Sequence, residues 1–445
     1  MAYTAPTAEK PASLRQESGP FAPNRSSTER VPAAAMGTLG MGMLGISLAW
    51  QIYNAYLPLI LQAGRPDFAA GAHLKGFALS PSAAGFVMTL DNIAALLILP
   101  YVGVLSDRTR TRWGRRLPYV AVGMPIAVLS FFAIPLAVNA GLIALLATIF
   151  VFLLAMDLFR TPLVALMPDL TPSRHRSTAN GFITVLYNVG TVLAYGLGGV
   201  LFRVSVAAPF YLEALGLLLG VGLVLLLIRE PRQTEAEDTH AQDEAPTLAF
   251  LLKSLVVARD ASARFLLGAV FVWTVGSSAV EIFFSSFIIQ RFGIDPGRAT
   301  SMMAFFGMAA LLGAVPAGFA GKRWGRRNAI RVSLCTMTLL LLSVNVVGTL
   351  PALRFTLIGM GLSWSLVMVN ALPMVLDLSP SRKTGGAYAG LHLLATQAAS
   401  IVGPVLAGAV LSLAGHNYQA LFVYIPALMF TALLLMNGVR HGEAR

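Results

Sequence analysis

The chain has 445 residues, of which 56% are apolar and only 12% are Asp, Glu, Lys or Arg. Soluble domains carry about a quarter charged residues, so this composition excludes an ordinary soluble protein. The net charge of +12 would suggest nucleic acid as a partner of a soluble protein. Here the positive residues gather in loops between apolar stretches, a pattern typical of membrane proteins, and we expect no nucleic-acid partner.

Repeated apolar stretches are long enough to cross a membrane as helices, for which about twenty residues suffice. Residues 1–35 are polar and rich in Pro, Ser and Ala, and are expected to form a disordered cytoplasmic tail. The single cysteine, Cys335, excludes a disulfide framework and a thiol metal site. In chain order the predicted spans are 36–62, 82–105, 118–138, 141–162, 179–202, 208–229, 263–290, 298–320, 328–349, 352–376, 386–413 and 417–438.

The longest polar connection runs from Arg229 to Ala263 and holds the densest acidic cluster of the chain. It predicts a cytoplasmic linker, 230–262, between an N-terminal six-helix bundle, 36–229, and a C-terminal one, 263–438. Residues 439–445 would form a second cytoplasmic tail.

The loop charges predict the orientation of the chain. If both termini lie on one side, only six of the 32 Lys and Arg residues fall in the opposite loops. Because positive loops stay in the cytoplasm, we expect a multi-pass protein of the cell membrane with cytoplasmic N- and C-termini. The six are Arg65, Lys75, Arg203, Arg291, Arg298 and Arg354.

Two sequence motifs occur once in each predicted bundle. The segment Arg112–Arg116 reads RWGRR, as does Arg323–Arg327. Similarly, Asp169–Arg174 reads DLTPSR and Asp377–Arg382 reads DLSPSR at nearly the same separation. Both motifs fall on the predicted cytoplasmic side, which indicates parallel repeats related by an axis along the membrane normal.

These loops carry a family resemblance. Gly318–Arg327 resembles the signature loop of the major facilitator superfamily, with Lys322 where that signature has Asp. The longer first copy, Gly103–Pro118, and the end of span four, Pro162–Leu170, resemble the glycoside–pentoside–hexuronide cation symporters and the sucrose transporters. The resemblance implies an all-α membrane fold of twelve transmembrane helices in two pseudo-symmetric six-helix bundles. It also implies sugar uptake coupled to a proton or a sodium ion.

One departure from that family concerns span two. In those symporters, acidic residues bind the coupling cation just before a proline that corresponds to Pro100. The equivalent places here hold Ala95 and Leu99, so the resemblance does not carry over a sodium site there. The proton is therefore the first candidate for the coupling ion and sodium the alternative, and we expect no other cofactor and no metal.

Ionisable residues inside spans are costly to bury and mark cavities, ion pairs or proton relays. Asp157 and Arg160 lie three residues apart on one helical face. They form either a structural pair that orients span four or a pair that opens for a proton or for substrate. Asp91 and Glu281 are each either a proton carrier or an acid bonded to a neighbouring helix. The predicted coupling residues are Asp91, Asp157 and Glu281.

Sugar binding calls for aromatic faces that stack on a ring and for amides or carboxylates that bond its hydroxyls. Span one gathers several such residues within two turns, and Arg160 can donate to hydroxyls. For the single residues on other spans, interhelical packing is the competing interpretation. The predicted substrate-binding residues are Trp50, Gln51, Tyr53, Asn54, Arg160, Tyr187, Asn188, Trp273, Asn370 and Gln397.

The repeated charged loops are predicted to act as a conformational latch between the bundles when the carrier is open to the outside. The competing interpretation is that they only orient the chain. The latch residues are Asp107, Arg108, Arg112, Arg115, Arg116, Asp169, Arg323, Arg326, Arg327 and Asp377.

The sequence thus predicts a secondary active transporter for proton-coupled symport of a sugar or glycoside by alternating access. Its partners would be the solute and the lipid bilayer, with no obligate protein partner. The alternatives are an exporter of drugs or lipid-like solutes, which an apolar cavity would favour, and a non-transporting membrane sensor. An enzyme is not expected, because no phosphate-binding loop, H-E-x-x-H helix or G-x-S-x-G elbow occurs.

Overall fold

The computed structural model describes residues 33–66, 68, 74–171, 175–230, 261–379 and 385–442. Within these ranges the chain is helical, apart from its loops and one isolated bridge between Thr111 and Gly114. The predicted linker and the predicted N-terminal tail lie almost entirely outside the described residues, and of the predicted C-terminal tail residues 439–442 are described.

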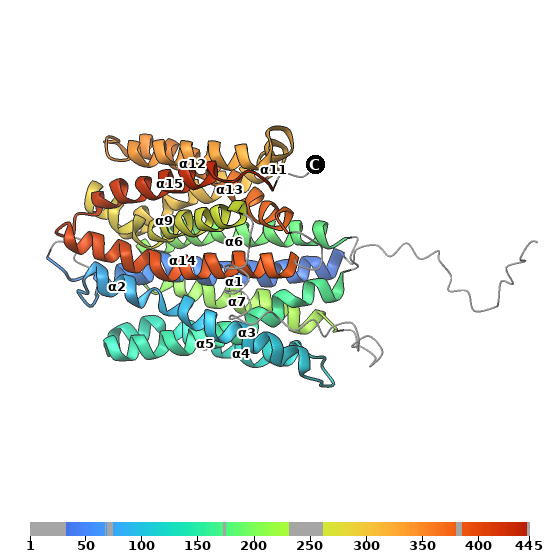
Figure 1. Cartoon of the computed structure of the whole chain (residues 1–445). Helices are drawn as coiled ribbons and strands as arrows, with labels where there is room; N and C mark the ends of the chain where they lie inside the picture. Colours follow the sequence, from blue (N-terminus) through green and yellow to red (C-terminus); the bar gives the residue numbers. More distant parts are fainter. Residues whose placement is uncertain are drawn as a thin grey trace, which may run out of the picture.

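Each half of the chain contributes six membrane spans, as predicted (Figure 1). The helices of the N-terminal half are α1 (Ala33–Gln62), α2 (Pro81–Val87), α3 (Leu90–Arg108), α4 (Leu117–Ala140), α5 (Leu142–Leu170), α6 (Arg176–Val204) and α7 (Ala208–Leu227). Those of the C-terminal half are α9 (Ala261–Phe292), α10 (Pro296–Ser301), α11 (Met303–Trp324), α12 (Arg326–Ser343), α13 (Leu350–Asp377), α14 (Gly385–Leu413), the 3-10 turn η4 (Tyr418–Ala420) and α15 (Leu421–Asn437).

Eleven of the described segments are long and apolar enough to cross a membrane. Helix α12 is the remaining span of the fold, and its first six residues include Arg326, Arg327 and Arg331. It packs against α13 and α15 within the C-terminal half. The arginines lie at one end of α12, where their side chains can reach the edge of the membrane.

Two predicted spans are broken near one end. Span two consists of α2 and α3, which are separated at Met88 and Thr89, and span eight consists of α10 and α11, separated at Met302. The Thr89 hydroxyl donates to the carbonyl of Phe86 at 2.7 Å. The break places Asp91 in the first turn of α3, where a negative charge is favoured by the helix dipole.

Helix α1 lies at the centre of the N-terminal half. It packs against α5, α6 and α7, and it also contacts α9 of the other half. Its most apolar stretch is 83% buried, the highest share among the eleven candidate spans. The side chains of α1 are therefore well placed to line any space between the halves.

The two ends of the helix bundle differ in charge. We call the end with the loops α3–α4 and α11–α12 the basic end, because those loops carry the repeated arginine motifs. The other end, where α2 and α10 begin and α6 and α14 finish, is the opposite end. In Figure 1 these loops and the start of α2 lie at the two ends of the bundle.

Candidate functional site

A cavity of about 160 Å³ lies between the two halves. Helices α1, α3, α5 and α6 of the N-terminal half and α9 and α14 of the C-terminal half contribute its walls. Most of the side chains that face it are polar. The lining residues are Trp50, Gln51, Asn54, Met88, Asp91, Asn92, Ala95, Arg160, Tyr187, Ser278, Glu281, Ile282, Gln397 and Ser400.

The cavity brings together eight residues predicted from the sequence to bind substrate or to carry protons. They come from six helices that are far apart in the chain. These residues are Trp50, Gln51, Asn54, Asp91, Arg160, Tyr187, Glu281 and Gln397.

Two amides of α1 are fixed by hydrogen bonds. Asn54 Nδ2 donates to Glu281 Oε1 at 2.8 Å, which joins the N-terminal half to the C-terminal half inside the cavity. On the other side, the hydroxyl of Tyr195 donates to Gln51 Oε1 at 2.7 Å. Because both amides keep further donors or acceptors, they can also bond a solute.

The Arg160 guanidinium lies over the indole ring of Trp50, 5.5 Å from its centroid. Trp50 in turn packs edge-on against Tyr53 and Phe152. A cation over an aromatic face is held electrostatically, so this contact positions Arg160 at the cavity wall with its N–H groups available.

Asp157 is nearly inaccessible, with 1% of its surface exposed, and does not line the cavity. Neither of its carboxylate oxygens accepts a hydrogen bond. The predicted pairing with Arg160 is not formed in this structure, because Arg160 stacks on Trp50 instead. A buried acid in this position needs either a proton or a hydrogen-bond donor.

The three predicted coupling acids form one electrostatic group. Asp91 lies within interaction range of both Glu281 and Asp157. Its carboxylate accepts hydrogen bonds from the backbone and the side-chain amide of Asn92, each at 2.6 Å. A charge on Glu281 or on Asp157 is therefore felt at Asp91.

Four predicted substrate-binding residues lie outside the cavity. Trp273 and Tyr53 are buried in helix packing. Asn370 donates to the carbonyl of Ala317 at 3.2 Å, and Asn188 donates to that of Thr184 at 2.9 Å. In this structure the side chains of both asparagines therefore serve to bond backbone carbonyls of helices.

Three polar wall residues were not among the predicted site residues. Asn92 follows Asp91 directly, and Ser400 lies three residues after Gln397 on the same face of α14. Ser278 lies three residues before Glu281 on α9. Helical spacing from the predicted residues was the signal that could have found Ser400 and Ser278.

At the basic end, the charges of the N-terminal half form a network within that half. Arg116 pairs with Asp169, and its Nη2 lies 3.1 Å from the Asp107 carboxylate. Arg115 Nη2 donates to Asp169 at 3.0 Å, and Glu230 accepts from the backbone N–H of Arg116 at 2.9 Å. These contacts tie the α3–α4 loop to the end of α5.

Among the described residues, the corresponding charges of the C-terminal half make fewer contacts. Arg326 pairs with Asp377, and Arg327 donates to the carbonyl of Asn437 at 3.0 Å. Among the other latch residues, Arg112 lies over the ring of Trp113, whereas Arg108 and Arg323 are exposed. The role of the whole set as a latch between the halves stays a prediction.

At the opposite end, the halves touch directly. Ser82 of α2 donates to the carbonyl of Gly408 in α14 at 3.0 Å and bonds the hydroxyl of Ser412 at 2.7 Å. Gln62 donates to the Ser286 hydroxyl at 3.3 Å and accepts from Tyr418. The C-terminal half is therefore bonded to both α1 and α2 at this end.

Backbones also approach closely at the opposite end. A Cβ atom on Gly297 of α10 would lie 2.4 Å from the carbonyl oxygen of Gly199 in α6, and one on Gly85 would lie 2.4 Å from that of Pro404. Both distances are too short for any side chain. Glycine is thus required where α6 meets α10 and where α2 meets α14.

Two helical bundles around a polar cavity at their interface, joined firmly at one end, define a membrane transport protein. The chain matches the Major Facilitator Superfamily over residues 33–389 and 266–443 and belongs to that family.

Two curated relatives are resistance proteins. The chain is 24% identical to Multidrug resistance protein 2 of Bacillus subtilis (strain 168) over 409 residues, which cover 90% of this chain and 96% of the relative. It is 25% identical over 275 residues to the class H Tetracycline resistance protein of Pasteurella multocida, covering 60% of this chain and 66% of the relative.

Solved structures share the fold at low sequence identity. A bacterial homolog of the human lysosomal transporter Spinster has a TM-score of 0.70 at 15% identity and covers 93% of this chain and 97% of its own. The nucleoside transporter NupG has a TM-score of 0.70 at 14% identity and covers 92% and 100%. The D-xylose–proton symporter has a TM-score of 0.64 at 15% identity and covers 91% and 96%.

Proposed function

We propose that this transporter carries a small polar solute of the sugar or glycoside class, coupled to protons, by alternating access. The observation that carries the proposal is the polar cavity between the halves, with Asp91, Arg160 and Glu281 in its wall. Charged groups are costly within a membrane and are kept where they serve a pathway.

The size and chemistry of the cavity support a small hydroxylated solute. Its volume of about 160 Å³ is below the roughly 300–1,000 Å³ of pockets for drug-sized ligands. Gln51, Asn54 and Gln397 offer amides to hydroxyl groups, and Trp50 offers an aromatic ring. The lining of this cavity is mostly polar, whereas export of lipid-like solutes would favour an apolar lining.

The coupling step centres on Glu281. As a carboxylate it accepts the hydrogen bond from Asn54 across the halves. Protonation turns one of its oxygens into a donor, so Glu281 can then bond a solute hydroxyl as well. Proton and solute thereby favour each other's binding, which is the differential affinity that a coupled cycle requires.

Asp91 and Asp157 would share this proton. Asp91 faces the same cavity, and neither carboxylate oxygen of the buried Asp157 accepts a hydrogen bond. A proton that enters the cavity has three acids within electrostatic range, and the arrangement of the halves would decide which of them holds it.

The orientation follows from the loop charges. With the basic end in the cytoplasm, the contacts at the opposite end close the carrier toward the outside. The state described here then has its seal on the outer side, and both termini lie in the cytoplasm.

The comparisons favour two different solute classes. A likeness to the D-xylose–proton symporter and to NupG fits a hydroxylated solute. The relatives named for resistance to drugs, one of them matched over 90% of this chain, favour drug export as the second candidate function. The polar lining of the cavity favours the first.

The test is uptake by purified protein in liposomes with an imposed pH gradient, using a panel of labelled sugars and glycosides. We expect accumulation of at least one solute, its loss with an uncoupler, and continued exchange of bound solute. Concentrative uptake that survives an uncoupler would contradict proton coupling, and uptake that also survives sodium removal would contradict symport with either ion. Efflux of a cationic dye without uptake of any sugar would support the second candidate.

Glu281→Gln sharpens the test, because the amide keeps the size of the side chain but cannot take up a proton. It should abolish accumulation while exchange persists. Asn188→Ala is the matched control, since Asn188 lies outside the cavity and its side chain donates to the carbonyl of Thr184 in its own helix. Unchanged accumulation in Glu281→Gln would remove Glu281 from the coupling step.

A further inference from the structure

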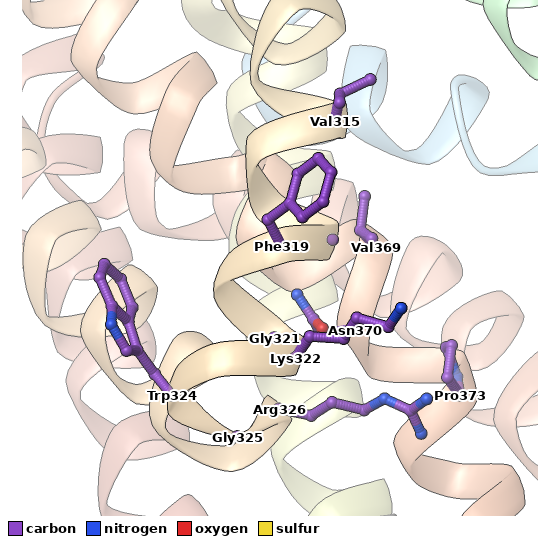
Figure 2. A pocket seen from close by; sticks show the side chains of 11 residues that line it. Val315, Phe319, Gly321, Lys322, Trp324, Gly325, Arg326, Val369, Asn370 and Pro373 are labelled. Atoms are coloured by element: carbon purple, nitrogen blue, oxygen red, sulfur yellow. The ribbon is translucent and has the colours of Figure 1, made fainter.

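A second, larger cavity of about 790 Å³ opens between α11 and α13 at the basic end of the C-terminal half. Figure 2 shows its apolar wall, with Val315 and Phe319 on one helix and Val369 on the other. Lys322 and Arg326 lie at the end of the same space. The cavity thus has an apolar part and a cationic part.

The apolar part continues onto the outer surface of α11. Met308, Leu312, Val315 and Phe319 are all exposed and follow one another at intervals of three or four residues, so they form one stripe. The stripe runs along the membrane span α11 toward Lys322. An acyl chain that lay along it would therefore bring its head group to the lysine.

The cationic part has an excess of positive charge. Arg326 is paired with Asp377, whereas Lys322 has no ion-pair partner among the described residues. No acidic side chain lines the cavity in the part of the chain that the structure describes. An anion beside Lys322 would therefore complement the charge of the cavity.

The internal repeat shows that this excess is particular to one half. Lys322 follows Gly318 by four residues, as Asp107 follows Gly103 in the first copy of the motif. In the N-terminal half Asp107 lies 3.1 Å from Arg116, and Asp169 and Glu230 add two more acids to the network. In the C-terminal half a lysine replaces the first of these acids, and among the described residues the ion pairs of the repeated motif in this half reduce to that of Asp377 with Arg326.

The start of α12 adds donors. Gly325 is its N-cap, with a φ of +82°, and no side chain caps the helix there. The N–H groups of a helix N-terminus favour anions. Gly325 and Arg326 both border the cavity.

We propose that the space between α11 and α13 binds an anionic phospholipid, with its phosphate beside Lys322 and Arg326 and an acyl chain along Val315 and Phe319. The two parts of the cavity fit the two parts of such a molecule. A free phosphate would use only the cationic part, and a neutral lipid only the apolar part.

The test measures lipid retention by native mass spectrometry of the purified, full-length protein. The probes are phosphatidylglycerol, phosphatidylcholine with the same acyl chains, and glycerol 1-phosphate as a head group without chains. We expect phosphatidylglycerol to be retained in preference to both. Equal retention of phosphatidylcholine, or displacement by glycerol 1-phosphate at matched concentration, would overturn the proposal.

Variants locate the site. Lys322→Gln should weaken phosphatidylglycerol binding about fivefold, the effect expected for one basic residue near a membrane surface, and Lys322→Asp should weaken it further. Arg323→Gln is the matched control, because Arg323 is the neighbouring exposed cation but does not line the cavity. Val369→Phe should reduce lipid retention by filling the apolar part.

The unfolding temperature without added lipid checks that each variant is folded. If Lys322→Gln and Arg323→Gln lower retention equally, the binding reflects general surface charge and the assignment to this cavity is wrong. If Val369→Phe leaves retention unchanged, the acyl chain does not lie between α11 and α13.

Discussion

The opposite end and the basic end hold the protein together in different ways. At the opposite end, backbones and small side chains of the two halves touch, as where Gly199 meets Gly297. At the basic end, the ion pairs around Asp169 and Asp377 each stay within one half. Close backbone packing is either complete or absent, whereas long charged side chains can exchange partners over several ångströms. Close backbone packing therefore suits a seal, and ion pairs between long side chains suit an end that opens.

One added methyl group should be enough to break the seal at the opposite end. In Gly297→Ala the new Cβ atom would lie 2.4 Å from the carbonyl oxygen of Gly199, and overpacking of this kind costs about 1–3 kcal/mol. The population of the sealed state should therefore fall roughly 5- to 150-fold relative to the state that is open at this end. Labelling of cysteines introduced at the opposite end, together with transport in liposomes, measures the shift.

Gly222→Ala provides the control for that experiment. A Cβ atom at Gly222 in α7 meets nothing within 4 Å, so the same substitution should change neither labelling nor transport. Equal labelling in the two variants would show that the glycine contact between α6 and α10 does not hold the end closed.

The network of the N-terminal half should matter for stability and not for the seal. Asp169→Asn removes a carboxylate that pairs with both Arg115 and Arg116 and is only 15% exposed. We expect a loss of about 1.5–3 kcal/mol, the range for hydrogen bonds to charged groups, seen as a lower unfolding temperature. Labelling at the opposite end should stay unchanged.

The side chains at the seal should contribute less than the backbones. Ser82→Ala removes the bonds to Gly408 and Ser412 while leaving the close approach of Gly85 intact. A loss of about 0.5–1.5 kcal/mol would raise labelling at the opposite end only slightly. An effect as large as that of Gly297→Ala would mean that hydrogen bonds, and not backbone packing, form the seal.

The smallest effect is expected for Asp377→Asn. Among the described residues its carboxylate pairs with Arg326, and it is 31% exposed; such pairs contribute about 0–1 kcal/mol. Its unfolding temperature should drop less than that of Asp169→Asn. The reverse order would show that the C-terminal network is as tight as the N-terminal one.

The spans could be predicted from apolar length and loop charge alone, because the membrane imposes both. The helix breaks at Thr89 and Met302 could not be predicted, since neither position holds the proline or glycine that usually marks a helix break in a sequence. They are seen only once α2 packs against α14 and α10 against α6. Local signals thus gave the spans, and contacts between distant helices gave their irregularities.

Much of the candidate site could also be predicted, since Asp91, Arg160 and Glu281 stand out as charges inside spans. The partner of Arg160 could not. Its spacing from Asp157 favoured an ion pair, but Trp50 from another helix takes the guanidinium. Asn370 and Trp273 carry the same residue types as the site, yet they face neighbouring helices, which sequence alone does not reveal.

Helix α1 has a consequence for how the protein is made. It is the least apolar of the eleven candidate spans and the most buried, and its neighbours α5, α6, α7 and α9 all follow it in the chain. During synthesis it enters the bilayer before any of them exists. Until α6 and α9 follow, Gln51 and Asn54 lack the hydrogen-bond partners Tyr195 and Glu281 that they have in the finished protein.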